Sequence, residues 1–340
     1  MTTWPLLALI AVLAFVLTGA LRRYALARSI IDVPNARSSH SVPTPRGGGV
    51  AIVLCFIGAI PLLAGNFGLA SDVAIALGGA GMLVALIGFL DDHGHIAARW
   101  RLLAHFSAAA WALYWLGGSP PLALPGMQIE TGALGIALAA FYLVWVLNLY
   151  NFMDGIDGIA SVEAVCVCVG GAVLYWQVGA AAAAIAPLAL AAAVAGFLMW
   201  NFPPARIFMG DAGSGFLGIT LGILSLQAGW VEPNLFWAWL VLLGVFVVDT
   251  TFTLLRRLIR GEKVHEAHRS HAYQYASRRY GRHLPVTLAV LTINILWLLP
   301  LALVVGSGKI EGIFGLLLAY VPLVVLAACF RAGKRETPAQ

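Results

Sequence analysis

Charged side chains are scarce in this sequence. Asp, Glu, Lys and Arg together make up 10% of the 340 residues, whereas a soluble domain carries about 25%. Hydrophobic residues account for 61% of the chain, and its mean hydropathy is +0.90. This shortage of charge excludes an ordinary soluble domain and indicates an integral membrane protein.

Cysteine is also rare, and its positions exclude two structural roles. The apolar stretches contain all four cysteines, which are Cys55, Cys166, Cys168 and Cys329. On a helix, Cys166 and Cys168 would point about 200° apart. The pattern therefore excludes a disulfide framework and a zinc knuckle. Because the sequence shows no internal repeat and no soluble appendage, we predict a single domain over residues 1–340.

Long apolar stretches dominate the chain. Eleven of them have roughly the 17–25 residues that a helix needs to cross a membrane. The first lacks the basic start of a secretory signal peptide, and we predict that it is the first span. We therefore predict an all-α polytopic bundle of about 11 transmembrane helices, with a count of ten left open by a weak break near 177–181. The stretches are 4–20, 47–65, 71–90, 102–118, 131–148, 160–177, 181–200, 213–229, 235–255, 286–305 and 312–330.

Lys and Arg lie almost entirely on one side of this predicted topology. Nineteen of the 20 fall in alternate loops or at the C-terminus, and only Lys309 lies on the opposite side. Because positive residues favour the cytoplasmic side, we predict a periplasmic N-terminus, a cytoplasmic C-terminus and an odd number of spans. The net charge of +5 then reflects topology and contact with anionic membrane lipid or phosphate, with no need for a nucleic-acid partner.

The other ionisable residues gather on the same predicted side. All eight histidines lie in or beside the cytoplasmic loops. An ion-coupled secondary transporter would more often place ionisable residues at span centres, open to both sides in turn. The one-sided arrangement therefore favours an active site at the cytoplasmic face. The acids on that side include Asp91, Asp92, Asp154, Asp157, Asp211 and Asp249.

One polar motif interrupts the apolar pattern directly after a predicted span. In "NLYNFMDGIDG" (148–158), four polar residues recur at three-residue intervals: Asn148, Asn151, Asp154 and Asp157. Such residues also form ordinary turns. Oxygen-only ligands nevertheless suit a hard cation such as Mg²⁺, which takes one or two carboxylates together with substrate phosphates.

Two further motifs place acids at predicted helix ends. In "GFLDDHGH", Asp91 and Asp92 close the third span, as solvated charges or as a pair that holds a proton or a divalent cation. Carboxylates are unfavourable at a helix C-terminus, which favours a functional role. In "MGDAGSG", Asp211 precedes a helix start; this is a plain glycine-rich turn or a carboxylate beside free N–H groups, suited to a metal-bridged phosphate.

Two loops combine basic residues with turn formers. The loop 256–283 is dense in Arg and His, and positive-inside anchoring explains part of this. Arginine also offers bidentate donors to phosphate. His265, His268 and His271 resemble a zinc pattern only superficially, because no cysteine completes the set. The first loop, "DVPNARSSHSVPTPRGGGVAIV", is either a Pro/Gly linker or a rigid basic contact for phosphate or nucleotide.

In combination, these motifs resemble those of the polyprenyl-phosphate N-acetylhexosamine-1-phosphate transferases. This glycosyltransferase 4 type family is related to the enzyme that makes lipid I in peptidoglycan synthesis. The resemblance extends over about residues 32–285. The segments that carry it, in order, are "DVPNARSSHSVPTPRGGG", "GFLDDHGHIAARWRLL", "NLYNFMDGIDGIA", "NFPPARIFMGDAGSGFLG" and the Arg/His loop.

The resemblance implies a Mg²⁺-dependent sugar-1-phosphate transferase (EC 2.7.8 type) of the bacterial inner membrane, with Mn²⁺ as a substitute cation. Undecaprenyl phosphate would attack the β-phosphate of a UDP-N-acetylamino sugar and release UMP. A phosphate nucleophile needs mainly positioning and charge neutralisation. The sequence leaves open whether attack is direct or passes through a covalent aspartyl-phosphate, and whether the protein is a homodimer.

The resemblance also implies roles for individual residues. Asp211 resembles the family's magnesium-binding aspartate, and Asp92 and Asp154 are predicted as further metal ligands. The predicted catalytic residues are Asp91, Asp92, Asp154 and Asp157, with Asp91 as the base or as the group that positions the acceptor phosphate. The predicted substrate-binding residues are His40, Arg46, Arg101, Asn151, Arg206, His268 and His271.

The chain departs from this family at its histidine motif. Relatives often carry two or three clustered histidines, whereas this sequence reads "HRSHAYQY", with Tyr273 and Gln274 where further histidines are common. The departure favours the O-antigen and capsule-initiating branch, with UDP-FucNAc or UDP-QuiNAc as donor. A UDP-GlcNAc-specific transferase for cell-wall or common-antigen synthesis is the alternative.

Overall fold

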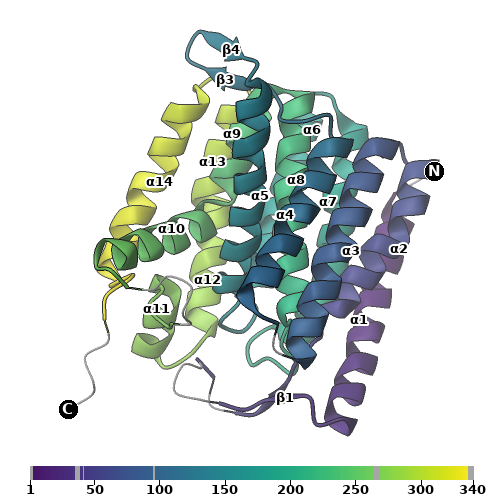
Figure 1. Cartoon of the computed structure of the whole chain (residues 1–340), viewed down its shortest axis with the longest axis vertical. Helices are drawn as coiled ribbons and strands as arrows, with labels where there is room; N and C mark the ends of the chain where they lie inside the picture. Colours follow the sequence, from purple (N-terminus) through teal and green to yellow (C-terminus); the bar gives the residue numbers. More distant parts are fainter. Residues whose placement is uncertain (1–2, 35–38, 41, 95, 263–267, 336–340) are drawn as a thin grey trace.

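The computed structural model describes residues 3–34, 39–40, 42–94, 96–262 and 268–335. Regular structure in this part of the chain is almost entirely helical (Figure 1). Two small antiparallel sheets accompany the helices there. They are formed by strands β1 (Ile31–Asp32) and β2 (Thr44–Pro45), and by strands β3 (Leu122–Leu124) and β4 (Met127–Ile129). The all-α membrane fold predicted from the sequence is confirmed.

The helices follow one another with short connections. In chain order they are α1 (Trp4–Ala27), α2 (Val50–Asn66), α3 (Ser71–His93), α4 (Ala98–Trp115), α5 (Gly132–Met153), α6 (Ile159–Gln177), the 3₁₀ turn η1 (Ala181–Ala184), α7 (Ile185–Asn201), α8 (Asp211–Val231), α9 (Pro233–Leu242), α10 (Gly244–Ile259), α11 (Ala272–Tyr280), α12 (Leu284–Ile293), the π-helical segment η2 (Asn294–Leu298), α13 (Leu299–Gly306) and α14 (Gly312–Cys329).

Each of the eleven predicted spans coincides with a helix or a run of helices. Within the described residues, eight helical segments are long and apolar enough to cross a membrane, and the bent pair α9–α10 is a ninth. The other two predicted spans coincide with α2, which has 17 residues, and with α4, whose first turn carries Arg99 and Arg101. The weak break near 177–181 is a turn between α6 and η1.

The predicted span 235–255 is not one straight helix. The axes of α9 and α10 differ by 70° at the break around Leu243. The reason lies in α10, which combines a buried polar side containing Asp249 and Arg257 with exposed apolar residues such as Leu258. Polar groups are costly in a lipid environment. The bend keeps them near α11, and Figure 1 shows α10 lying across the bundle at that level.

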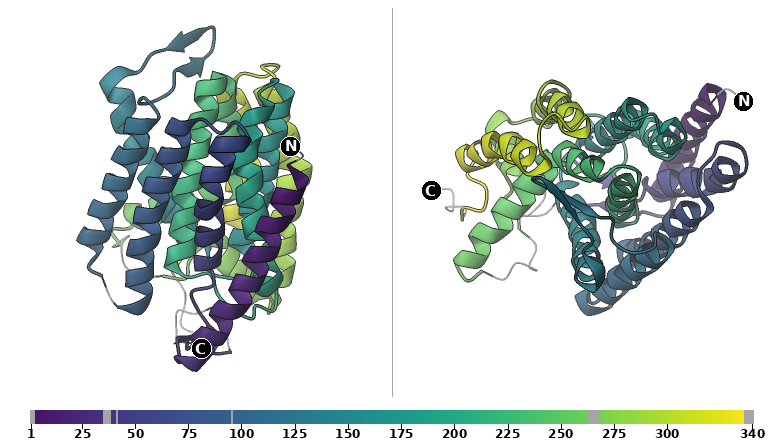
Figure 2. Two further views of the ribbon diagram at one scale, coloured as in Figure 1. Left: turned by 90° about the vertical axis from the view of Figure 1, so that its right-hand side faces the viewer. Right: turned by 90° about the horizontal axis from the view of Figure 1, so that it is seen from above.

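The two described ends of the chain lie at opposite ends of the bundle. In Figure 1 the N-terminus is at the upper end, whereas β1, α11 and the C-terminus are at the lower end. We call this lower end the polar end. Figure 2 shows most of the long helices running side by side between the two ends. This placement agrees with the odd number of spans predicted from the sequence.

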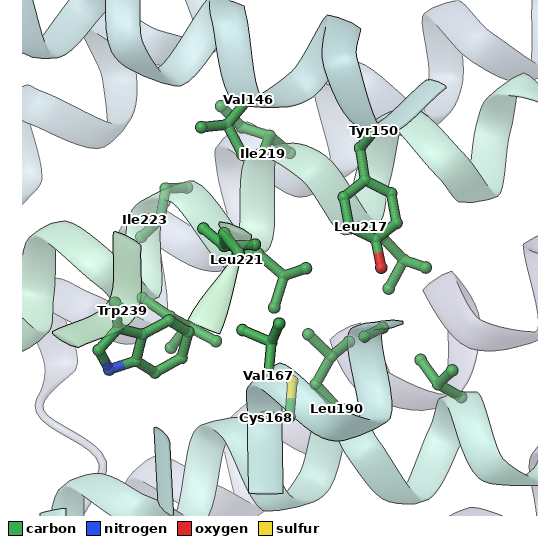
Figure 3. Close-up of a cluster of buried hydrophobic side chains, with 14 of the residues drawn as sticks. Val146, Tyr150, Val167, Cys168, Leu190, Leu217, Ile219, Leu221, Ile223 and Trp239 are labelled. Atoms are coloured by element: carbon green, nitrogen blue, oxygen red, sulfur yellow. The ribbon is translucent and has the colours of Figure 1, made fainter. Parts of the chain in front are cut away.

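Helix α8 lies in the middle of the apolar core. It packs against α3, α5 and α9, and its residues Ala212–Leu226 are buried throughout. Figure 3 shows α8 side chains such as Leu217 and Leu221 between Tyr150 of α5 and Trp239 of α9. Small residues along α8 allow this close approach between helices, as is usual in membranes.

The tightest approach between α3 and α8 occurs at the polar end. Gly88 faces the start of α8 so closely that an added Cβ atom would lie 2.6 Å from the backbone nitrogen of Ala212. The backbones therefore touch here without an intervening side chain. This contact places Asp91 and Asp92, one turn further along α3, beside Asp211 at the first position of α8.

We predict that Gly88→Ala destabilises the protein although alanine is the better helix former. The added methyl would force α3 away from α8, and such overpacking costs about 1–3 kcal/mol. Thermal unfolding in detergent measures the effect. The matched control is Gly58→Ala in α2, where no atom lies within 4 Å of the added Cβ. Equal melting temperatures for the two variants would contradict the prediction.

Candidate active site

A cavity of about 210 Å³ opens at the polar end between segments that are far apart in the sequence. Its wall is built from the first loop, the α5–α6 turn, the start of α8 and one residue of α11. Its polar lining includes Arg46, Asn151, Asp154, Asp157, Asp211 and Gln274. The sequence predicted five of these six residues as parts of a site, and the structure brings those five together.

The start of α8 is held by a carboxylate from α3. Asp92 accepts hydrogen bonds from the backbone N–H of Asp211 (3.1 Å) and of Ala212 (3.3 Å). Gly210 directly before them has φ +80°, a conformation that favours glycine. A carboxylate at a helix N-terminus satisfies unpaired N–H groups and interacts favourably with the helix dipole. Asp92 therefore fixes the position of Asp211.

Arg46 bridges two of the acids. Its Nη2 lies 2.8 Å from Oδ1 of Asp92 and 2.7 Å from Oδ1 of Asp211. Burial alone would lower the pKa of Arg46, but the charges of Asp211 and Asp92 outweigh this effect and raise it. The guanidinium is thus a fixed cation at the cavity wall, and it fastens the first loop to α3 and α8.

Asp91 forms a separate contact on the other side of the α3 end. Its carboxylate pairs with the guanidinium of Arg101 in α4 and accepts the backbone N–H of Ile96 at 2.9 Å. Arg101 also lies 4.0 Å from Oδ2 of Asp211. The Asp91 and Asp92 side chains are only 8% and 3% exposed. Both lie outside the cavity wall formed by the described residues.

The motif at 148–158 divides between packing and the cavity. Asn148 donates to the carbonyl of Val144 within its own helix (2.7 Å), and so serves α5 itself. Asn151 donates to Oγ of Ser214 (2.9 Å) and ties α5 to α8.

Asp154 follows the last residue of α5 and faces the cavity. Burial raises the pKa of Asp154, and the charge of Asp211 adds to this effect.

Asp157 is held by a histidine that the sequence analysis did not select. His283 Nδ1 lies 3.0 Å from Oδ1 of Asp157, and its Nε2 lies 2.9 Å from the carbonyl of Ser39. Asp157 also accepts the backbone N–H of Ala205 (3.0 Å). Burial disfavours the charged ring, but Asp157 outweighs it, so the pKa of His283 is raised. The only signal in the sequence was its place at the end of the Arg/His loop.

The two predicted histidines of that loop do not form part of the described cavity wall. His271 is buried at the start of α11, with Nδ1 3.4 Å from Oδ1 of Asp249. Asp249 in turn accepts the backbone N–H groups of Ala272 and Tyr273 and so caps α11. His268 stacks on His271 at 4.9 Å, and burial lowers the pKa of His268 to about 3. Both histidines thus support α11 from behind.

The remaining predicted residues differ in their placement. His40 lines the cavity and contacts the ring of Phe208 at 4.8 Å. Arg206 is exposed and lies over the ring of Trp200, 5.9 Å from its centre. Within the described residues, no three His, Cys, Asp or Glu side chains converge on a single point as a complete set of metal ligands. Asp154 and Asp211 are the acids that face the cavity from neighbouring helix ends.

Comparison with known proteins places this arrangement in a family. Residues 74–229 match Glycosyl transferase family 4. The chain is 30% identical over 270 residues to the probable undecaprenyl-phosphate N-acetylglucosaminyl 1-phosphate transferase of Bacillus subtilis (strain 168), covering 76% of this chain and 72% of that protein.

Two other relatives show similar levels of identity. The decaprenyl-phosphate N-acetylglucosaminephosphotransferase of Mycobacterium tuberculosis (strain ATCC 25618 / H37Rv) is 29% identical over 315 residues, covering 79% of this chain and 76% of that protein. The phospho-N-acetylmuramoyl-pentapeptide-transferase of Streptococcus thermophilus (strain CNRZ 1066) is 28% identical over 211 residues, or 59% and 57%. The chain belongs to Glycosyl transferase family 4, as its motifs predicted, and is a multi-pass membrane enzyme.

We predict that the Asp157–His283 contact makes stability depend on pH. Because the pKa of His283 is raised in the folded protein, its contribution is fully present below about pH 6.5 and is lost as pH rises through the raised pKa. The melting-temperature difference between wild type and His283→Gln should therefore shrink between roughly pH 6.5 and pH 9. His93→Gln, at the exposed end of α3, is the control. A His283→Gln difference that stays constant with pH would contradict the prediction.

Proposed function

We propose that this protein transfers an N-acetylamino-sugar 1-phosphate from a UDP-sugar to undecaprenyl phosphate and releases UMP. The observation that carries the proposal is the cavity at the polar end, where Arg46, Asp154 and Asp211 face one space beside apolar spans. The names of the relatives support the same class of reaction, since they describe transfer of sugar phosphates to polyprenyl phosphates. A lipid acceptor also explains why the site lies at the end of membrane helices.

In the proposed reaction, an oxygen of the acceptor phosphate forms a bond to the β-phosphorus of the donor. The bond between that phosphorus and the oxygen bridging to the α-phosphate breaks, and UMP leaves with the bridging oxygen. A phosphate monoester has a second pKa of about 6, so the acceptor is mostly deprotonated at neutral pH. The protein must therefore supply mainly positioning and charge neutralisation.

The arginines at the cavity are suited to that task. Arg46 and Arg101 both lie at the Asp211 carboxylate, at 2.7 Å and 4.0 Å. We propose that these guanidiniums bind the phosphate groups of the substrates, because arginine offers paired donors to phosphate oxygens. Asp91 and Asp92 then act through the two arginines and the α8 start, rather than as the base that the sequence suggested for Asp91.

We propose that Asp211 and Asp154 hold a Mg²⁺ ion, with Asn151 close to both and Asp92 behind them. The donors fit this ion, since Mg²⁺ usually takes one or two carboxylates and completes its shell with water and substrate phosphates. Mn²⁺ would be accepted by the same oxygen ligands. When bound, the cation supplies charge neutralisation at the pyrophosphate.

The donor sugar and the pathway form a finer part of the proposal. Tyr273 and Gln274, which replace histidines common in the family, lie at or beside the cavity. We therefore propose a UDP-FucNAc or UDP-QuiNAc donor and a role in starting O-antigen or another surface glycan at the bacterial inner membrane. The relatives named for N-acetylglucosamine transfer favour UDP-GlcNAc as the second candidate. Membership of this family counts against the transporter alternative.

We predict that the purified protein, with undecaprenyl phosphate and Mg²⁺, releases UMP from at least one UDP-N-acetylamino sugar. A panel containing UDP-FucNAc, UDP-QuiNAc and UDP-GlcNAc, followed by UMP release, identifies the donor. Chelation of the metal should stop turnover, and added Mg²⁺ or Mn²⁺ should restore it. No UMP with any sugar, from protein that remains folded, would rule out the proposed reaction.

We further predict that Asp211→Asn lowers turnover by at least about 100-fold, since charge stabilisation at the reacting phosphates is the main catalytic contribution. The melting temperature should change little, because the backbone N–H of residue 211 still binds Asp92. Asp72→Asn is a matched control, as Asp72 is also an acid in the first turn of an apolar helix but at the opposite end. Near-normal turnover of Asp211→Asn would remove Asp211 from the proposed metal site.

A further inference from the structure

Helix α11 holds one side-chain amide in a defined orientation. Gln274 is the third residue of α11, and its Oε1 accepts the backbone N–H of His271 at 3.3 Å, completing a capping box. A backbone N–H requires an acceptor, so the oxygen of the Gln274 amide must face His271. The Nε2 group, which only donates, therefore points the other way.

The other polar groups around Gln274 are already engaged. The Tyr273 hydroxyl donates to the carbonyl of Phe152 (2.9 Å), and Ser277 donates to the carbonyl of Gln274 itself (2.9 Å). Asp249 caps the helix from α10. These contacts fix α11 against the end of α5. The Gln274 side chain consequently loses little freedom when it binds something else.

The Nε2 group faces the cavity. Gln274 is one of the lining residues, and its Nε2 would lie 3.3 Å from a Cβ atom added to Gly155, in the turn between Asp154 and Asp157. Among the described residues, no hydrogen-bond acceptor is recorded for Nε2, although the side chain is 93% buried by the fold. A neutral N–H donor is thus held ready beside a wall of carboxylates.

We propose that Gln274 Nε2 donates a hydrogen bond to an acceptor oxygen of the bound UDP-sugar, which makes Gln274 a residue that determines donor specificity. The acceptor is the acetamido carbonyl of the sugar or an oxygen of the diphosphate. This inference rests on the proposed transferase function. A site built around a fixed donor discriminates against ligands that lack the matching acceptor, because the buried group is then left unpaired.

Two substitutions separate this role from the capping role. Gln274→Glu keeps an oxygen for the His271 N–H, and Glu is favoured at this capping-box position, but it removes the donor and adds a negative charge. Gln274→Met has a similar size, removes the donor without adding charge, and also removes the cap. Both variants and wild type are assayed for UMP release with varied UDP-sugar and with varied undecaprenyl phosphate, and their melting temperatures are compared.

If Gln274 binds the donor, both variants raise the KM for the UDP-sugar by about three- to tenfold, the size expected for one hydrogen bond. The KM for undecaprenyl phosphate stays unchanged, and Gln274→Glu keeps the wild-type melting temperature. A change in Gln274→Met alone shows a capping role only and overturns the proposal. A change in Gln274→Glu alone shows a charge effect and also overturns it, as does wild-type behaviour of both.

The choice of acceptor oxygen is tested with a second donor. UDP-hexoses without the acetamido group are compared with the preferred UDP-N-acetylamino sugar in the wild type and in both variants. If the acetamido carbonyl is the acceptor, the variants lose their defect with the UDP-hexose; if a diphosphate oxygen is the acceptor, the defect persists. Failure of the wild type to release UMP from any donor refutes the transferase function itself, and is thereby distinguished from failure of this inference.

Discussion

The buried carboxylate of Asp92 is the contact on which the site depends. It receives two backbone N–H groups at the start of α8 and the guanidinium of Arg46. A buried charge is tolerated only when it is paired and hydrogen-bonded, and here every partner comes from a different part of the chain. The same contact sets the position of Asp211 and holds the first loop over the cavity. Chemistry at the polar end therefore depends on the packing of α3 against α8.

Much of this architecture is predictable because it depends on local properties of the sequence. Apolar length predicts the helices, and the distribution of Lys and Arg predicts that the polar loops share one end. The regular spacing of Asn151, Asp154 and Asp157 and the helix start at Asp211 also predict correctly that these groups meet. Each of these signals is readable from a segment of one or two dozen residues, without knowledge of the neighbouring helix.

The details that were not predicted depend on contacts between distant segments. Whether Asp91 or Asp92 turns toward α8 is decided by the rotation of α3, which the close contact at Gly88 fixes. His283 acquires its role from Ser39, more than 240 residues away. His271 looked like a ligand by spacing, but Asp249 holds it behind α11. The bend between α9 and α10, which brings Asp249 there, leaves no local mark stronger than a polar residue late in an apolar stretch.

The attachment of α11 has a consequence for how such enzymes diverge. The acids at the cavity lie at the ends of long, buried helices, so a change there disturbs the bundle. Helix α11 is only nine residues long, and it is fastened by caps and one tyrosine hydroxyl. Substitutions on its cavity-facing side can therefore accumulate without repacking the core. In evolutionary terms, the fold separates a slowly changing reaction centre from a small element on which substrate preference is free to drift.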